Sequence, residues 1–148
     1  MRTMHAPNDH AELVARIRRL APDQPRKWGT MSAPQMIAHL RDQMGHTLGD
    51  ITPAPIVDFR RFSPVRYLAI YWVPWPRGRI QGPPEAFVTQ PAHWEQDVEV
   101  LIALLGRFAA RDVSLPWPDH AIFGTMSSRD WGVFCYKHFN HHLTQFGV

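Results

Sequence analysis

Cysteine is almost missing from this chain, which holds a single one, Cys135, among its 148 residues. Because a disulfide needs two thiols, no intrachain disulfide framework can stabilise the fold, and this composition suits the reducing cytoplasm. Long apolar runs are missing too. The longest, residues 67–73, falls far short of the ~20 residues that a membrane-spanning helix needs. We therefore expect a cytoplasmic protein with no membrane contact.

Two further absences bear on targeting and partners. Residues 1–7 lack the apolar segment of a secretory signal peptide. Neither sign of charge dominates: 16 Lys and Arg residues against 13 Asp and Glu residues leave a formal net charge of +3, and the arginines are scattered. A small scattered excess is typical of solvated faces, so we expect no nucleic-acid partner.

Apolar side chains are abundant, at 45% of the chain, which is too many for a disordered protein. The length suits one domain, which we place at residues 1–148. Apolar residues recur at helical spacing over residues 9–20 and 92–110, which predicts two helices. At the start of the first, Asp9 and Glu12 resemble a capping box.

Two more helices are predicted by a repeated start signal. Residues 28–32 and 123–127 both read aromatic, Gly, Thr, Met, Ser. The serine is a good N-cap in each case, and a polar side chain three residues later can bond back to it. These starts predict helices over residues 32–48, which Gly49 ends, and 127–146. The repeat is either a shared capping solution or a sign that both helices enter a bundle in equivalent ways.

The connection between the second and third predicted helices, residues 50–91, is interrupted by prolines and shows no strong period. We expect a short helix near residues 64–73 within it. A connection this long is often functional, and its tryptophans either pack over the helices or form a lid or a dimer contact. The fold class we predict is all-α: a four-helix bundle of antiparallel type, with this irregular, Pro/Trp-rich excursion wrapped outside it.

Histidines are the residues that suggest chemistry. His138 and His142 lie four apart, so they project from one face of the last predicted helix, on an apolar stripe that should face the core. Two buried imidazoles need partners, and one metal ion would satisfy both. His39, on the 32–48 helix, would complete a set of three neutral nitrogen ligands with at least one open position. That set suits a catalytic zinc-type or nickel-type site.

The positions of these histidines constrain how their helices pack. His39 lies ~10 Å along its helix from Ser32, whereas His138 and His142 lie ~16 and ~22 Å along theirs from Ser127. One ion can reach all three only if the two helix starts are offset, or if the helices run antiparallel or cross steeply.

Other ligands remain open at this stage. His141 is the main rival, although it lies ~60° round the helix from His138, and His46 is a weaker rival. We expect a structural role for His120 in its loop and simple packing for the thiol of Cys135.

Other cofactors are less well supported. A carboxylate-bridged di-iron site is disfavoured because no Glu lies three residues before any histidine. Haem held by two histidines stays open, although no C-x-x-C-H attachment motif exists. We expect Gln145, one turn beyond His142, to hydrogen-bond a group behind the ligands or a bound water.

Three groups of residues carry a resemblance to a known family. They are Trp28, Met31, Ser32, Gln35, Met36 and His39; then His120, Phe123 and Gly124; then His138, His142 and Gln145. In this set the chain is similar to the DinB/YfiT-like metalloenzyme superfamily. The likeness is greatest to a small branch, a domain of unknown function, that ends in His-His-x-x-Gln-Phe-Gly, here residues 141–147. It covers nearly the whole chain and is weak over residues 50–91.

The resemblance implies a four-helix bundle that holds one divalent metal ion, zinc or nickel, through His39, His138 and His142. Better-known relatives are thiol-dependent transferases and isomerases that use low-molecular-weight bacterial thiols. By analogy, the expected function is a metal-dependent enzyme with thiol-dependent transferase or hydrolase-like chemistry on a small molecule. The alternative is a non-catalytic metal-binding or dimerising helical module, with residues 72–75 as the contact surface of a homodimer.

Overall fold

Four long helices dominate the structure, a computed structural model that describes residues 1–77 and 87–148. They are α1 (Pro7–Arg18), α2 (Ala33–Leu48), α4 (Trp94–Ala110) and α5 (Ser128–Gln145). The shorter elements between α2 and α4 are η1 (Phe59–Arg61), α3 (Ser63–Tyr67) and η2 (Leu68–Trp72), the last a turn of π-helix. The described residues form no strand, only an isolated bridge between His120 and Gly124, so the all-α prediction is confirmed.

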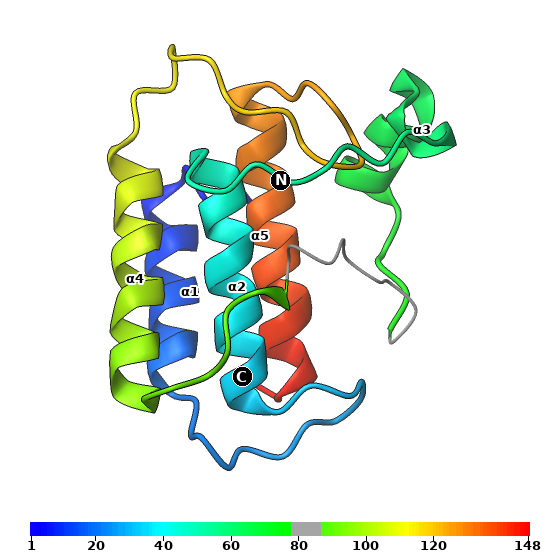
Figure 1. Cartoon of the computed structure of the whole chain (residues 1–148). Coiled ribbons are helices and arrows are strands. Elements are labelled where there is room, and N and C mark those ends of the chain that lie inside the picture. The colour runs from blue at the N-terminus through cyan, green and yellow to red at the C-terminus, as the bar shows by residue number, and fades with distance from the viewer. Residues whose placement is uncertain (78–86) are drawn as a thin grey trace.

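The four long helices lie side by side (Figure 1). Helix α1 packs against α4 and α5, and α2 packs against the same two helices. Neighbours α2 and α5 run antiparallel, which is one of the arrangements that the histidine spacing allows. Helices α2 and α4 run parallel, because the connection between them returns the chain to the end where α2 began (Figure 1).

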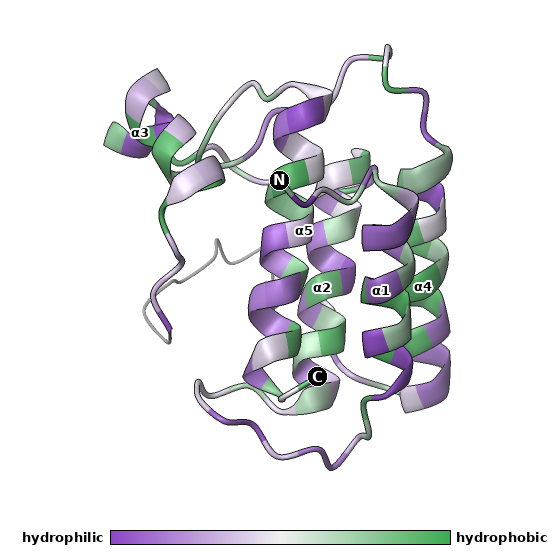
Figure 2. Ribbon diagram, turned by 180° about the vertical axis from the view of Figure 1, so that it is seen from behind, coloured by the Kyte–Doolittle hydropathy of each residue, from purple (hydrophilic) through white to green (hydrophobic). Residues whose placement is uncertain are grey.

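The interior between these helices is apolar. Hydrophilic and hydrophobic residues alternate along α1, α4 and α5 (Figure 2), as expected for helices that bury one face. The stripe predicted on the third long helix is buried, with Val98, Leu101, Leu105 and Phe108 in the core. Burying each such side chain contributes roughly 1.5–3 kcal/mol. Despite this apolar content, no helix among the described residues is long and apolar enough to cross a membrane.

The start of α1 differs from the prediction. The helix begins at Pro7, its N-cap is Ala6, and no side chain caps it. Proline suits the first helical position because it has no amide hydrogen to satisfy. The carboxylate of Asp9 instead accepts a hydrogen bond from the Thr3 amide at 2.8 Å. The expected capping box of Asp9 and Glu12 was therefore wrong.

The repeated start signal forms the same structure twice. Ser32 caps α2 in a capping box with Gln35, and Ser127 caps α5 in a capping box with Asp130. The preceding glycines, Gly29 and Gly124, have φ angles of 82° and 67°, a left-handed conformation that glycine adopts without steric cost. The shared capping solution is thus confirmed for both histidine-bearing helices.

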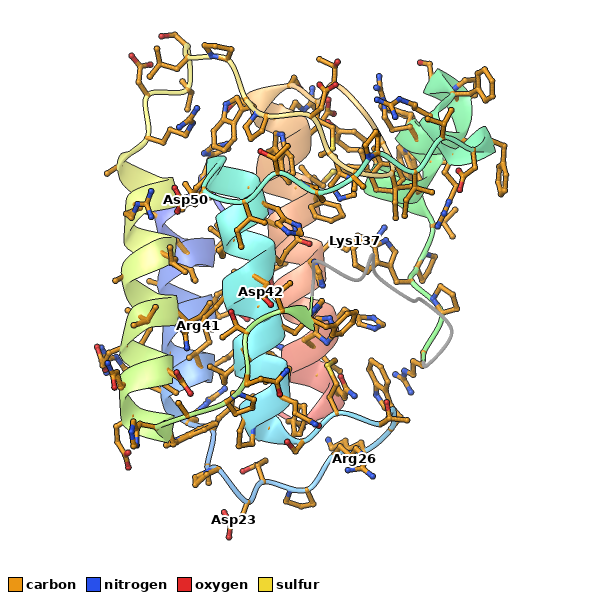
Figure 3. All side chains as sticks on the ribbon, in the orientation of Figure 1. Asp23, Arg26, Arg41, Asp42, Asp50 and Lys137 are labelled. Carbon is orange, nitrogen blue, oxygen red and sulfur yellow. The ribbon has the colours of Figure 1, made fainter. Side chains whose placement is uncertain are left out.

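Of the expected excursion, residues 50–91, all but residues 78–86 lie within the described part of the chain. Its short helix is present as α3 and η2, which stand beside α5 rather than between the long helices (Figure 1). Lys137 of α5, labelled in Figure 3, donates hydrogen bonds to the carbonyl oxygens of Ala69 at 2.8 Å, Ile70 at 3.3 Å and Val73 at 2.6 Å. One ammonium group therefore attaches this segment to α5.

Another attachment lies beyond residues 78–86. The carboxylate of Asp42 on α2, labelled in Figure 3, accepts hydrogen bonds from the amide of Thr89, at 2.9 Å, and from its hydroxyl. The two tryptophans of the excursion behave differently: Trp72 is 65% exposed, whereas the Trp75 ring packs 5.4 Å from that of Phe134 on α5. The expected packing of the tryptophans over the long helices is therefore confirmed for Trp75 but not for Trp72.

Candidate metal centre

Three histidines from two helices converge at one point. His39 lies six residues into α2, and His138 lies seven residues before the end of α5, so antiparallel packing sets them at the same level. The Nε2 atom of His138 lies 3.1 Å from Nε2 of His39 and 2.9 Å from Nε2 of His142. One nitrogen from each ring falls within 4.8 Å of the other two, so this cluster could hold a metal ion.

Burial keeps two of these three rings, His138 and His142, uncharged at neutral pH. His39, His138 and His142 are only 5%, 7% and 8% exposed. Burial, together with the neighbouring imidazoles, lowers the pKa of His142 to about 3 and that of His138 well below the ordinary 6.5. A neutral imidazole has a free lone pair, which is the form that binds a metal ion.

The tautomer of His142 is fixed by the chain of contacts behind it. The side-chain amide of Gln145 donates to the Trp28 carbonyl oxygen at 2.8 Å, so its oxygen Oε1 turns toward His142. That oxygen can only accept, so Nδ1 of His142, 3.2 Å away, carries the proton. The Nε2 lone pair of His142 therefore points into the cluster.

Gly29 makes room for this contact. A Cβ atom at this position would lie 2.2 Å from Nε2 of Gln145, and the φ angle of 82° already disfavours any other residue. The glycine of the repeated start signal thus serves the site as well as the turn. Gln145 was expected to act behind the ligands, but a backbone carbonyl as its second partner could not be foreseen from sequence spacing.

His138 differs from His142, because none of the described residues orients its outer nitrogen, Nδ1. Its Nδ1 is buried and has no hydrogen-bond partner within the described ranges. The described surroundings therefore leave the tautomer of His138 to be set by the groups that approach its Nε2.

A cavity of about 460 Å³ opens beside the three rings. Its walls are mostly apolar: Phe87 stacks on His39 with ring centroids 4.8 Å apart, and Trp75 lies 5.4 Å from His138. Phe134 lies 5.6 Å from His138 on the same wall. The excursion contributes much of this lining, a role that its weak sequence pattern did not reveal.

The rival ligands lie outside the cluster. His141 is half-buried between Trp28, at 4.7 Å between ring centroids, and Trp75, at 5.8 Å. His46 and His120 are buried and line the cavity, but neither belongs to the group that could share an ion.

The lone thiol, three residues before His138 on α5, is not part of the histidine cluster. Cys135 is fully buried, with its sulfur 3.6 Å from the Thr47 hydroxyl. Burial raises the pKa of Cys135 to about 12, so it stays a protonated thiol at neutral pH. It acts as a core residue, as expected.

Comparison with known proteins places the chain in a family. No curated protein and no solved structure matched the sequence. A sequence model of the family described as "Protein of unknown function (DUF1569)" matches residues 2–147, nearly the whole chain. The protein therefore belongs to the DUF1569 family.

Proposed function

We propose that His39, His138 and His142 bind one divalent transition-metal ion, zinc or nickel, through their Nε2 atoms. We further propose that this ion serves an enzyme reaction on a small molecule bound in the adjoining cavity. The proposal rests on one observation above all: three buried imidazoles turn the same nitrogen toward a common point. Between two facing nitrogens only one proton fits, so burying three together is costly unless a cation is shared.

The donor set and its dimensions suit such an ion. Zinc–nitrogen bonds of ~2.0–2.1 Å in a tetrahedral site place ligand nitrogens roughly 3.3 Å apart. The Nε2 separations of His138 from His39 and from His142, 3.1 and 2.9 Å, need to widen by only a few tenths of an ångström. The nitrogens of His39 and His142 already lie within 4.8 Å of each other. Three histidines leave a fourth position, which would face the cavity.

A bound ion of this kind supplies Lewis acidity, which activates a water or a thiol or polarises a carbonyl. The residues of this chain would orient the ligands and exclude bulk water, through Gln145 behind His142 and the aromatic wall around the cluster. Cys135 cannot serve as a nucleophile, because it is buried and protonated. If the reaction consumes a thiol, a small molecule must bring it.

The arrangement of the four long helices supports the same proposal. The antiparallel contact of α2 with α5 and the pairwise packing of four long helices are what a four-helix bundle of DinB/YfiT-like type would show. We propose that the chain is a single domain of this type working in the cytoplasm. The activity, thiol-dependent transfer or a hydrolase-like reaction, is carried over by analogy alone.

Metal content tests the proposal directly. Protein purified without a histidine tag should contain close to one equivalent of a divalent ion, or should take up zinc or nickel in calorimetric titration. His138→Ala and His142→Ala should abolish tight binding, and His39→Ala should weaken it severely. His141→Ala is the matched control and should leave binding nearly intact. Loss of metal in His141→Ala with retention in His142→Ala would refute the ligand assignment. If the wild type binds metal, a screen for thiol-transfer activity would follow.

A second candidate function is a dimerising module. Large apolar side chains gather on the excursion with high exposure: Val57 78%, Phe59 66%, Phe62 69% and Trp72 65%. Exposed apolar patches of this kind often mark protein contacts. A dimer in sedimentation that dissociates in Phe62→Ser, combined with no metal uptake, would favour this function over the enzyme.

A further inference from the structure

His120 sits in a tight turn that holds its ring in one orientation. The backbone of His120 and Gly124 forms a two-bond bridge, with both amide-to-carbonyl distances at 2.8 Å. Within this turn, Nδ1 of His120 accepts hydrogen bonds from the amides of Ile122 at 3.1 Å and Phe123 at 3.2 Å. The ring also stacks on Phe123, with centroids 4.8 Å apart.

This geometry fixes which nitrogen is a donor. Nδ1 accepts two hydrogen bonds, so it carries no proton, and the single proton of the neutral ring is on Nε2. Burial, and the nearby His46, lower the pKa of His120 to about 3, so the ring stays neutral at physiological pH. His120 is therefore a fixed Nε2–H donor.

The donor has no acceptor among the residues that the structure describes. His120 is 9% exposed and lines the cavity, and none of the described residues accepts a hydrogen bond from its Nε2. The Nε2 atom is not among the fully buried atoms that lack a partner, so water can satisfy it in the free protein. A ligand that displaces this water has to supply an acceptor, or the donor loses its hydrogen bond. His120 also lies close to the metal cluster, since Phe134 contacts both His120, at 4.7 Å between centroids, and His138, at 5.6 Å.

The rest of the lining limits what the acceptor can be. Most of the wall is aliphatic or aromatic, and the one guanidinium among the described lining residues, that of Arg60, is held by the Asp58 carboxylate at 2.9 Å. An anionic ligand would therefore find no unpaired cation in this part of the wall. An uncharged acceptor suits a neutral imidazole donor better.

We propose that His120 donates a hydrogen bond to an uncharged acceptor, such as a carbonyl oxygen, on an otherwise apolar small molecule bound in the cavity. This assigns a substrate class to the site proposed above and in that sense rests on it. Binding through His120 needs no metal ion, which allows the two ideas to be tested apart.

The test uses two probes of similar shape: acetophenone, which has a carbonyl acceptor, and isopropylbenzene, which has none. Their dissociation constants would be measured by NMR titration of the metal-free, full-length protein and of His120→Asn. Asparagine places Oδ1 where histidine has Nδ1, so it preserves the acceptor of the turn, but it has no atom at the Nε2 position. His93→Asn, at an exposed histidine, is the control.

In His120→Asn, affinity for acetophenone relative to isopropylbenzene should fall about 5-fold, the effect of one hydrogen bond of about 1 kcal/mol. His93→Asn should leave the ratio unchanged. In the wild type, acetophenone should shift the Nε2–H signal of His120 and isopropylbenzene should not.

An unchanged ratio in His120→Asn, or no binding of either probe to the wild type, would overturn the inference. Zinc affinity is measured separately and should be equal in wild type and His120→Asn. A changed probe ratio in a protein that takes up no metal would leave His120 as the donor and refute only the metal site.

Discussion

At the scale of single residues, the amide of Gln145 decides how His142 can act. Gln145→Leu removes the acceptor of the Nδ1 proton, so the lone pair at Nε2 is no longer enforced. Loss of such a partner typically lowers metal affinity 10–100-fold, and we expect about that effect in zinc competition with a chelator. Gln145→Glu keeps an acceptor oxygen and should retain tight binding. Equal affinity in the Leu variant and the wild type would contradict this role.

Gly29 offers an independent test of the same contact. Gly29→Ala should displace the Gln145 side chain, because the new Cβ would lie 2.2 Å from its Nε2, and should therefore weaken zinc binding as well as stability. Gly106 on α4 is the matched control, since a Cβ there meets nothing within 4 Å. Gly106→Ala should stabilise the protein by ~0.5–1 kcal/mol in urea denaturation and leave zinc affinity unchanged. Equal zinc affinity and equal urea denaturation midpoints in Gly29→Ala and Gly106→Ala would contradict the prediction.

Acid should destabilise the metal-free protein through its buried histidines. Burial lowers the pKa of His120 and His142 to about 3, and that of His138 well below 6.5. Unfolding restores pKa values of about 6.5, so between ~pH 6.5 and ~pH 3 the unfolded chain binds more protons than the folded one. The free energy of unfolding should fall as the pH drops through this window and should not depend on these groups above ~pH 7.5.

Urea denaturation midpoints at a series of pH values would check this dependence. The fall should be shallower in His142→Gln, which removes one of the responsible rings. A midpoint that stays constant from neutral pH to ~pH 4.5 would show that these rings are not buried as the fold implies.

At the scale of elements, the two serine caps can be tested together. Ser32→Ala and Ser127→Ala each remove a side-chain oxygen that accepts an amide hydrogen bond at the third helical position, so each should cost ~1 kcal/mol. Ser32→Asp keeps a capping oxygen and should lose little. Denaturation midpoints that do not change in either alanine variant would contradict the capping assignment.

The elements that the sequence predicted well are those with local causes. Both capping boxes, the end of α2 at Gly49 and the apolar stripe of α4 depend on residues within a few positions of each other. The start of α1 was missed because Pro7 sets it without a capping side chain. The histidine pair on α5 was visible from its spacing of four, whereas its meeting with His39 depends on how two distant helices pack.

Apart from its short helix, the excursion could not be predicted, because the rest of its structure depends on distant partners. Lys137 binds three of its carbonyl oxygens and Asp42 binds Thr89, and no periodicity within residues 50–91 encodes either contact. The donor role of His120 was missed for a related reason: it comes from backbone amides two and three residues later. The short His-x-x-Phe-Gly sequence was the only available signal for that turn.

At the scale of the whole molecule, Lys137 joins the excursion to α5, the helix that carries His138 and His142. Lys137→Met would leave three carbonyl oxygens without their donor, so the segment around residues 68–75 should loosen. Hydrogen exchange of amides in this segment should accelerate at least 10-fold, while exchange within α2 and α4 stays slow. Lys27→Met, at an exposed lysine, is the control. Exchange equally slow in Lys137→Met and wild type would show that other contacts hold the segment.

The parallel course of α2 and α4 has a further consequence. A chain leaving the end of α2 must travel the length of that helix, ~24 Å for 16 residues, before α4 can begin. About eight extended residues would cover that distance, yet the chain uses residues 49–93 for it. The additional residues are not needed to connect the helices, so outside the anchored positions they can change in length and composition while the histidines stay in place. Among proteins with this helix arrangement, we expect differences in which small molecule the cavity binds to arise first from changes in this connection.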